Sequence, residues 1–149
     1  MKPTVFLRIA SVLTLIHSIL HTVGGVFGKP VPAAAAVLAA MQSTRFQVFG
    51  VTRSYSDFYT GMGLGVTIFL TVEAVVFWLI ASLVKTDGSR LRPILAVFMI
   101  GYLVFAADSY VFFFVGPIIV EVLIALCLGL AIMTAKPAVA VKGAAARAS

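Results

Sequence analysis

The chain has 149 residues, of which 62% are hydrophobic and 11% are charged, with a formal net charge of +6. An ordinary soluble domain is about 45 to 50% apolar, so the composition predicts an integral membrane protein and leaves no room for a second, soluble domain. The positive charge does not indicate nucleic-acid binding, because the Lys and Arg residues lie mostly in tails and connections, where they orient helices. The single cysteine, Cys127, excludes an intramolecular disulfide and a multi-cysteine metal site.

Four apolar segments are long enough to cross a bilayer, which takes about 20 residues per helix. We expect spans at about 5–26, 58–84, 93–112 and 117–135, although the third could end anywhere between Ala107 and Phe114. Asp87 and Gly88 mark a turn in the basic loop 85–92, and Pro117 suits the first position of the fourth helix. The sequence therefore predicts an all-α fold, a membrane four-helix bundle over residues 1–135, followed by a mobile basic tail at 136–149.

The first connection, from about 28 to 56, is too long to lack structure, since unstructured loops beyond about 12 to 15 residues are uncommon. Residues 33–42 are Ala-rich. We expect them to form a short helix near the membrane surface.

The basic residues predict the orientation of the spans, because Lys and Arg concentrate on the cytoplasmic side. With four spans, one side of the membrane carries Lys2, Arg8, Lys85, Arg90, Arg92, Lys136, Lys142 and Arg147. The other side carries only Lys29, Arg45 and Arg53. Both termini should therefore be cytoplasmic.

Ionisable side chains inside or at the ends of spans are the candidates for function, because each costs a few kcal/mol in the bilayer. All of them except Glu73 are expected in the outer half of the membrane, and Arg53 and Tyr59 flank one of them. The candidate ligand-binding residues are His17, His21, Arg53, Asp57, Tyr59, Glu73, Asp108 and Glu121. No complete catalytic motif is present, so the sequence assigns no catalytic residue and leaves open whether the protein is an enzyme.

The histidines and glycines admit more than one interpretation. His17 and His21 are spaced i, i+4 and share a helix face, so they could ligate a metal or haem together with a carboxylate, or be neutral and hydrogen-bonded to a carboxylate or backbone carbonyl. Asp57 could cap the second helix. Gly61 and Gly65 are predicted to form a smooth surface for helix packing.

Two segments together, His17–Gly24 (HSILHTVG) and Val51–Gly61 (VTRSYSDFYTG), resemble a family of small bacterial four-span membrane proteins. The helix layout is also loosely similar to DoxX-like proteins. The resemblance covers most of residues 5–135. It implies the architecture and a bacterial inner-membrane location but no substrate.

Three functions remain open. The first is an outward-facing polar pocket, lined by His17, His21, Arg53, Asp57 and Glu121, that binds or acts on a small lipophilic molecule such as a quinone or isoprenoid. The second is metal or haem binding by His17 and His21. The third is a non-catalytic subunit of a larger membrane complex. Membrane lipid is the expected environment, a homo-oligomer is compatible with the sequence, and no cofactor can be named.

Overall fold

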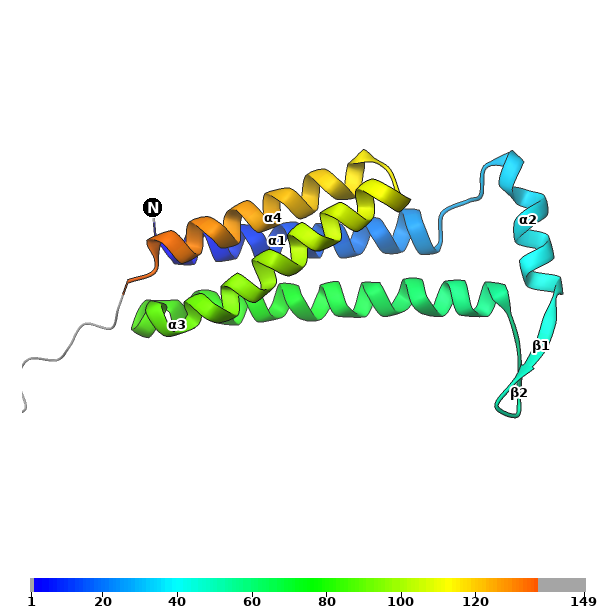
Figure 1. Ribbon diagram of the computed structural model, residues 1–149, viewed down its shortest axis with the longest axis horizontal. Coiled ribbons are helices and arrows are strands. Elements are labelled where there is room, and N and C mark those ends of the chain that lie inside the picture. Colours follow the sequence, from blue (N-terminus) through cyan, green and yellow to red (C-terminus); the bar gives the residue numbers. More distant parts are fainter. Residues whose placement is uncertain (1, 137–149) are drawn as a thin grey trace, which may run out of the picture. The chain divides into compact units, whose positions relative to one another are not determined.

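The structure is a computed structural model that describes residues 2–136, and it is almost entirely helical (Figure 1). Three helices are long and apolar enough to cross a membrane. The first is α1 (Pro3–Leu20), which continues as the π-helix η1 (His21–Val26); the others are α3 (Tyr55–Phe112) and α4 (Val115–Thr134). The expected all-α class is confirmed. The predicted tail lies outside the described residues, apart from Lys136.

Helix α3 bends at Asp87, which is the one residue of α3 with non-helical dihedral angles (φ −148°, ψ 78°). We call residues 55–86 the first arm and residues 88–112 the second arm. The turn at Asp87 was expected. The prediction of a basic loop over residues 85–92 was wrong, because the helix resumes directly after Asp87 and continues through Pro93. Asp87 explains the short connection, since its carboxylate accepts a hydrogen bond from Ser89 (3.0 Å) and pairs with Arg90 (2.8 Å).

The chain divides into two compact units. Unit 1 combines the N-terminal residues up to Thr14 with the chain from Glu73 onward, and unit 2 comprises Leu15–Val72. Each unit is described by itself.

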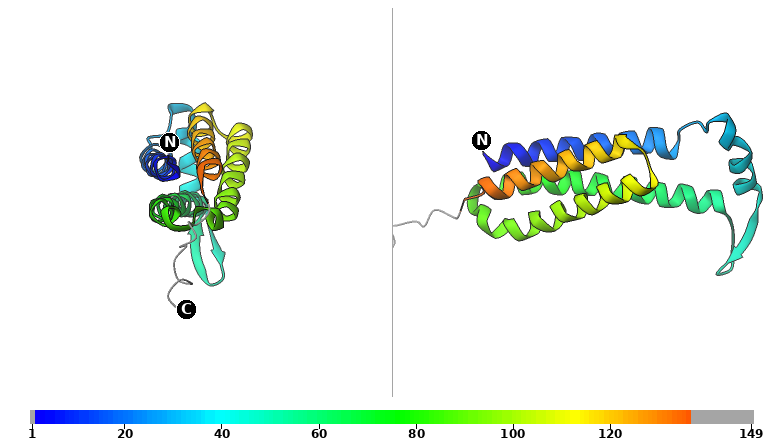
Figure 2. Two further views of the ribbon diagram at one scale, coloured as in Figure 1. Left: turned by 90° about the vertical axis from the view of Figure 1, so that its left-hand side faces the viewer. Right: turned by 45° about the horizontal axis from the view of Figure 1, so that its top comes forward.

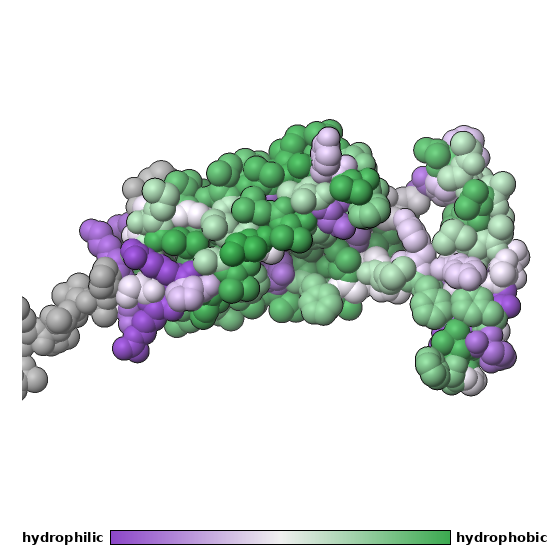
Figure 3. Space-filling view, in the orientation of Figure 1, coloured by the Kyte–Doolittle hydropathy of each residue, from purple (hydrophilic) through white to green (hydrophobic). Residues whose placement is uncertain are grey.

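Unit 1 contains the start of α1, the end of the first arm, the second arm and α4, which runs beside the second arm (Figure 2). Its core is a cluster of buried apolar side chains in which Phe77 meets Phe98 edge-on, with ring centroids 5.1 Å apart. The fully buried members include Leu7, Leu95, Ile124 and Leu128. Hydrophilic residues gather at the bend of α3, whereas the rest of the visible face of unit 1 is mainly hydrophobic (Figure 3).

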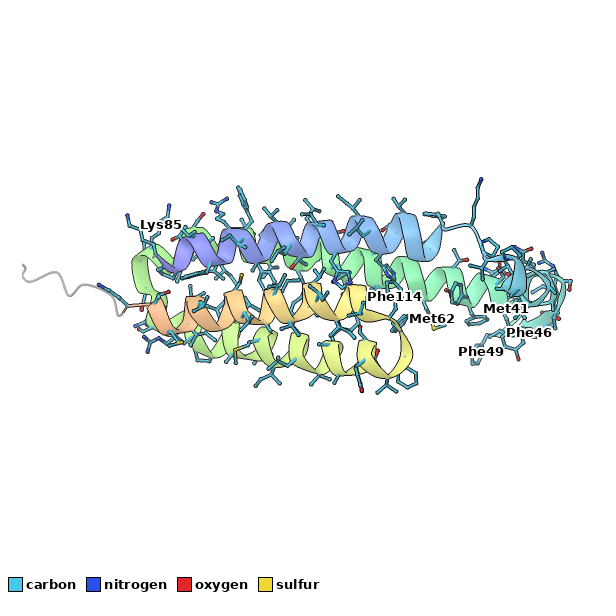
Figure 4. All side chains as sticks on the ribbon, turned by 90° about the horizontal axis from the view of Figure 1, so that it is seen from above. Met41, Phe46, Phe49, Met62, Lys85 and Phe114 are labelled. Carbon is cyan, nitrogen blue, oxygen red and sulfur yellow. The ribbon has the colours of Figure 1, made fainter. Side chains whose placement is uncertain are left out.

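The two ends of unit 1 are marked by Lys85, beside the bend, and Phe114, before α4 (Figure 4). The third predicted span ends at Phe112, inside the expected window, and α4 begins at Val115 rather than at Pro117. Phe114 has extended dihedral angles (φ −134°, ψ 172°) and its ring lies against Gly116, where a Cβ would be 2.9 Å from Cε2. Pro117 lies in the first turn of α4, where backbone N–H groups have no partner within the helix, so a proline is tolerated there.

Unit 2 contains the end of α1, η1, α2 (Pro32–Ser43), a β-hairpin and the start of α3. The hairpin pairs β1 (Arg45–Val48) with β2 (Val51–Ser54) in antiparallel register, and it was not predicted. Helix α2 falls within one residue of the expected range, and none of its residues is buried. After η1, Gly28 approaches the Gly24 carbonyl oxygen so closely that any Cβ would overlap it.

Candidate functional site

Unit 1 holds a hydrogen-bonded cluster of three polar side chains from α1 and both arms of α3. The Tyr102 hydroxyl donates to Oε2 of Glu73 at 2.6 Å and lies 3.3 Å from the Thr14 hydroxyl. The Thr14 hydroxyl itself donates to the Ala10 carbonyl oxygen. Tyr102 and Thr14 are buried, whereas Glu73 is only partly buried. We call these three residues the Glu73 cluster.

A second polar pair joins the second arm to α4 in the same unit. Ser109 donates to Oε1 of Glu121 at 3.0 Å, and both side chains are buried. Ser109 lies seven residues after Tyr102, so the two side chains share one face of the helix. Glu121 is within electrostatic range of Tyr102, and Asp108 is within range of Glu121 although Asp108 is itself exposed.

Unit 2 is held together by a polar seam of small hydroxyl side chains between α1, η1 and α3. Ser18 donates to the Thr67 carbonyl oxygen (3.0 Å) and meets the Thr71 hydroxyl (2.9 Å). Thr22 meets the Thr67 hydroxyl at 2.9 Å. Hydrogen bonds of this kind stabilise helix contacts in membranes by about 1 kcal/mol each. We call these residues the hydroxyl seam.

The two candidate histidines differ in their surroundings. His21, the first residue of η1, places Nε2 3.0 Å from the Gly63 carbonyl oxygen, which fits the interpretation of a histidine bonded to the backbone. His17 is buried on α1, within electrostatic range of His21. Residues 2–136 contain no group of three or more His, Cys, Asp or Glu side chains that could hold a metal ion.

The close helix contact in unit 2 is made by Gly63, not by Gly61 and Gly65 as expected. A Cβ at Gly63 would lie 2.9 Å from Cγ2 of Val26, whereas Cβ atoms at Gly61 or Gly65 would meet nothing within 4 Å. The absence of a side chain at Gly63 therefore lets the end of η1 approach α3, and it leaves the carbonyl oxygen open to His21.

The segment around Asp57 forms the start of α3. The Ser54 backbone N–H donates to Asp57 (2.7 Å), and the Asp57 N–H donates to the Ser54 hydroxyl (3.2 Å). This reciprocal pair is a capping box. Arg53 donates to the Thr52 carbonyl oxygen, and Tyr59 is exposed. The reciprocal pair fits the capping interpretation of Asp57.

The eight predicted site residues are thus distributed over both units. Unit 2 contains His17, His21, Arg53, Asp57 and Tyr59, and unit 1 contains Glu73, Asp108 and Glu121. Sequence reasoning missed Tyr102, the partner of Glu73, and Thr14, which contacts Tyr102. A tyrosine in the middle of an apolar run was the available signal, because a buried Tyr hydroxyl usually finds a hydrogen-bond partner.

An apolar groove of about 240 Å³ lies on unit 1 between the second arm and α4. Two small residues, Ala125 and Gly129, are part of its lining. The full lining is Met99, Leu103, Val122, Ala125, Leu126, Gly129, Leu130 and Met133.

No protein-family model matches the chain, and neither a curated protein nor a solved structure is significantly similar to it.

Proposed function

We propose that this is a four-span protein of the bacterial inner membrane, with both termini cytoplasmic, that binds a small lipophilic molecule at the Glu73 cluster. The ligand class is a quinone or an isoprenoid with a polar head. Positive residues at the bend of α3 and near both ends of the chain support the orientation.

The observation that carries the ligand proposal is the position of Glu73. Its carboxyl group lies on an apolar helix, is only partly buried, and has one oxygen held by Tyr102. Ionisable groups within membrane spans are costly and mark functional sites by default. A polar ligand head can hydrogen-bond to the carboxyl group while its tail stays among apolar side chains.

The hydroxyl groups beside Glu73 also allow a proton to move. The Thr14 hydroxyl can donate to Ala10 and the Tyr102 hydroxyl to Glu73, and the two hydroxyl oxygens lie 3.3 Å apart, where either can donate to the other. If Glu73 takes up a proton, it can donate to the Tyr102 oxygen, and Tyr102 can then donate to Thr14. A cluster with these two arrangements suits a ligand that gains or loses a proton, because a carboxyl group can act as its acid or base.

The test is binding of a short-chain ubiquinone analogue to the purified protein in nanodiscs, followed by quenching of Trp78, the single tryptophan. Saturable quenching is expected in the wild type and its loss in Glu73→Gln and Tyr102→Phe. Tyr110→Phe is the matched control, since Tyr110 is 80% exposed. A thermal unfolding scan of each sample separates lost binding from lost folding. Unaltered binding in folded Glu73→Gln protein contradicts the proposal.

The topology is tested separately with single cysteines in a Cys127→Ala background. Cysteines at Gln47 and at Ser89 lie in the first and second predicted connections. A membrane-impermeant maleimide should label intact cells at Gln47 only, and labelling at Ser89 contradicts the orientation.

A second candidate function is that of a partner subunit, and the apolar groove between the second arm and α4 favours it. Ala125 and Gly129 line it at the i, i+4 spacing that allows close helix approach in membranes. A subunit should co-purify with a larger complex, and the Gly129→Leu variant should no longer do so. Recovery of a monomer from native membranes by mild detergent contradicts this function. Metal or haem binding by His17 and His21 stays a prediction. Among the described residues, no group of three or more His, Cys, Asp or Glu side chains could hold a metal ion.

A further inference from the structure

The tip of the β-hairpin in unit 2 has a backbone conformation that its residues do not favour. Strands β1 and β2 are joined by a two-residue turn, Phe49–Gly50, with φ of +45° and +83°. Two-residue turns with both φ values positive favour Asn-Gly, Asp-Gly or Gly-Gly. A bulky residue at positive φ is strained, so the hairpin would form more easily without the phenylalanine.

Phe49 makes no compensating contact with the rest of unit 2, since its side chain is fully exposed (relative exposure 104%). The other hairpin phenylalanine, Phe46, packs against Tyr55 and Phe58 with centroid distances of 4.8 and 6.0 Å. Figure 4 labels both rings. The base of the hairpin is therefore fixed to the start of α3, and the strained, exposed ring projects from its tip.

The hairpin has two chemically different faces. Residues paired across the strands share a face. One face carries Phe46, Val48 and Val51, with Arg53, the partner of Phe46, at its base, so it is apolar toward the tip. The opposite face carries Gln47, which donates to the Thr52 hydroxyl at 2.8 Å. Figure 3 shows hydrophobic and hydrophilic residues side by side on this element. Such a two-faced element fits the boundary between hydrocarbon and water.

The charge of the connection and the direction of the hairpin both fit a position at the membrane surface. Residues 27–56 contain Lys29, Arg45 and Arg53 and no acidic residue. Asp57, which is within electrostatic range of both arginines, offsets one of these charges, so the region remains positive. Figure 1 shows α2 and the hairpin running roughly perpendicular to the first turns of α3. An element in that direction lies along the surface of a bilayer that α3 crosses.

We propose that the hairpin docks on the surface of the surrounding bilayer, with Phe49 inserted among the lipids and Arg45 and Arg53 bound to the phosphates of anionic phospholipids. Aromatic rings concentrate at this depth of a membrane. Contact with lipid compensates for the turn strain that Phe49 introduces.

The experiment places a fluorescent reporter at the tip. Phe49→Trp is made in a Trp78→Phe background and the full chain is reconstituted into phosphatidylcholine vesicles with and without phosphatidylglycerol. The emission maximum should shift to shorter wavelength, acrylamide quenching should fall, and lipids brominated close to the headgroup should quench. Gln47→Trp in the same background is the matched control and should remain accessible to acrylamide.

Two results overturn the proposal. Acrylamide quenching of Phe49→Trp equal to that of Gln47→Trp shows a tip in water. Protection from both acrylamide and brominated lipid shows that protein, a second copy or a partner, covers the ring. The arginines are tested by combining Arg45→Gln with Arg53→Gln. With both arginines present, the emission shift and the protection from acrylamide should be larger in vesicles that contain phosphatidylglycerol, and the double change should remove this difference.

Discussion

The Tyr102 hydroxyl donates a 2.6 Å hydrogen bond to Oε2 of Glu73, joining the two arms of α3 inside unit 1. The two residues are 29 positions apart in the sequence. Tyr102 also packs against Phe77 in the apolar core, with ring centroids 6.2 Å apart, and its other polar neighbour is the Thr14 hydroxyl.

Replacing Tyr102 by Phe should destabilise the protein by about 1–3 kcal/mol, since the Glu73 carboxyl group loses its donor in an apolar setting. Thermal unfolding in mild detergent, followed by circular dichroism, measures the loss. Tyr110→Phe should change nothing, because Tyr110 is exposed. Combining Tyr102→Phe with Glu73→Gln should cost less than the two single changes added together. Simple additivity would show that the pair does not interact.

Gly63→Ala should destabilise unit 2, because the added Cβ would come within 2.9 Å of Val26. Overpacking of this kind costs about 1–3 kcal/mol. Gly65→Ala is the control on the same helix and should be neutral or stabilising by up to about 1 kcal/mol, since a Cβ there meets nothing within 4 Å and Ala favours helix. The double change Gly63→Ala with Val26→Ala should restore much of the lost stability. No rescue would mean that the two side chains are not the cause.

Ser54→Ala should loosen the start of α3, because the Ser54 hydroxyl accepts the Asp57 N–H. Loss of such a cap costs about 1 kcal/mol. Ser56→Ala, in the same helical turn, leaves the capping box intact and should have a much smaller effect. Amide hydrogen exchange at residues 55–58 measures the change, and equal exchange in both variants would contradict the assignment.

Ser109→Ala should weaken the contact between the second arm and α4 by about 1–3 kcal/mol, since Glu121 is buried and loses a donor. Ser43→Ala serves as the control because Ser43 is exposed at the end of α2. Unfolding of both variants in the same detergent checks the prediction. Equal unfolding temperatures would show that Ser109 does not support Glu121.

The helices were predictable because long apolar runs rarely form anything other than helices. The turn at Asp87 was predictable because Asp-Gly interrupts such a run. The extent of the loop was not, since Asp87 uses its side chain to start the second arm immediately. The hairpin was missed because Phe49–Gly50 lacks the Asn-Gly or Asp-Gly signal that usually marks a two-residue turn.

The candidate site was predictable only in part. Glu73 was identified from the cost of a carboxyl group in a span, but neither its partner Tyr102 nor Thr14, which contacts Tyr102, was identified. A helix that is apolar on all sides has no stripe that shows which face points inward. For the same reason Gly61 and Gly65 were expected to pack closely, whereas the close contact belongs to Gly63, two positions from each of them.

The π-helix at His21–Val26 bears on how the chain length of this protein can vary. Its wide turn, closed by the hydrogen bond from the Phe27 N–H to the Thr22 carbonyl oxygen, holds one more residue than an α-helical turn. Deleting one of the two residues Gly24 and Gly25 would convert this segment to the ordinary helical repeat without breaking the helix. The first helix can therefore lose a residue here, where elsewhere along its length a deletion would turn every later side chain away from its neighbours.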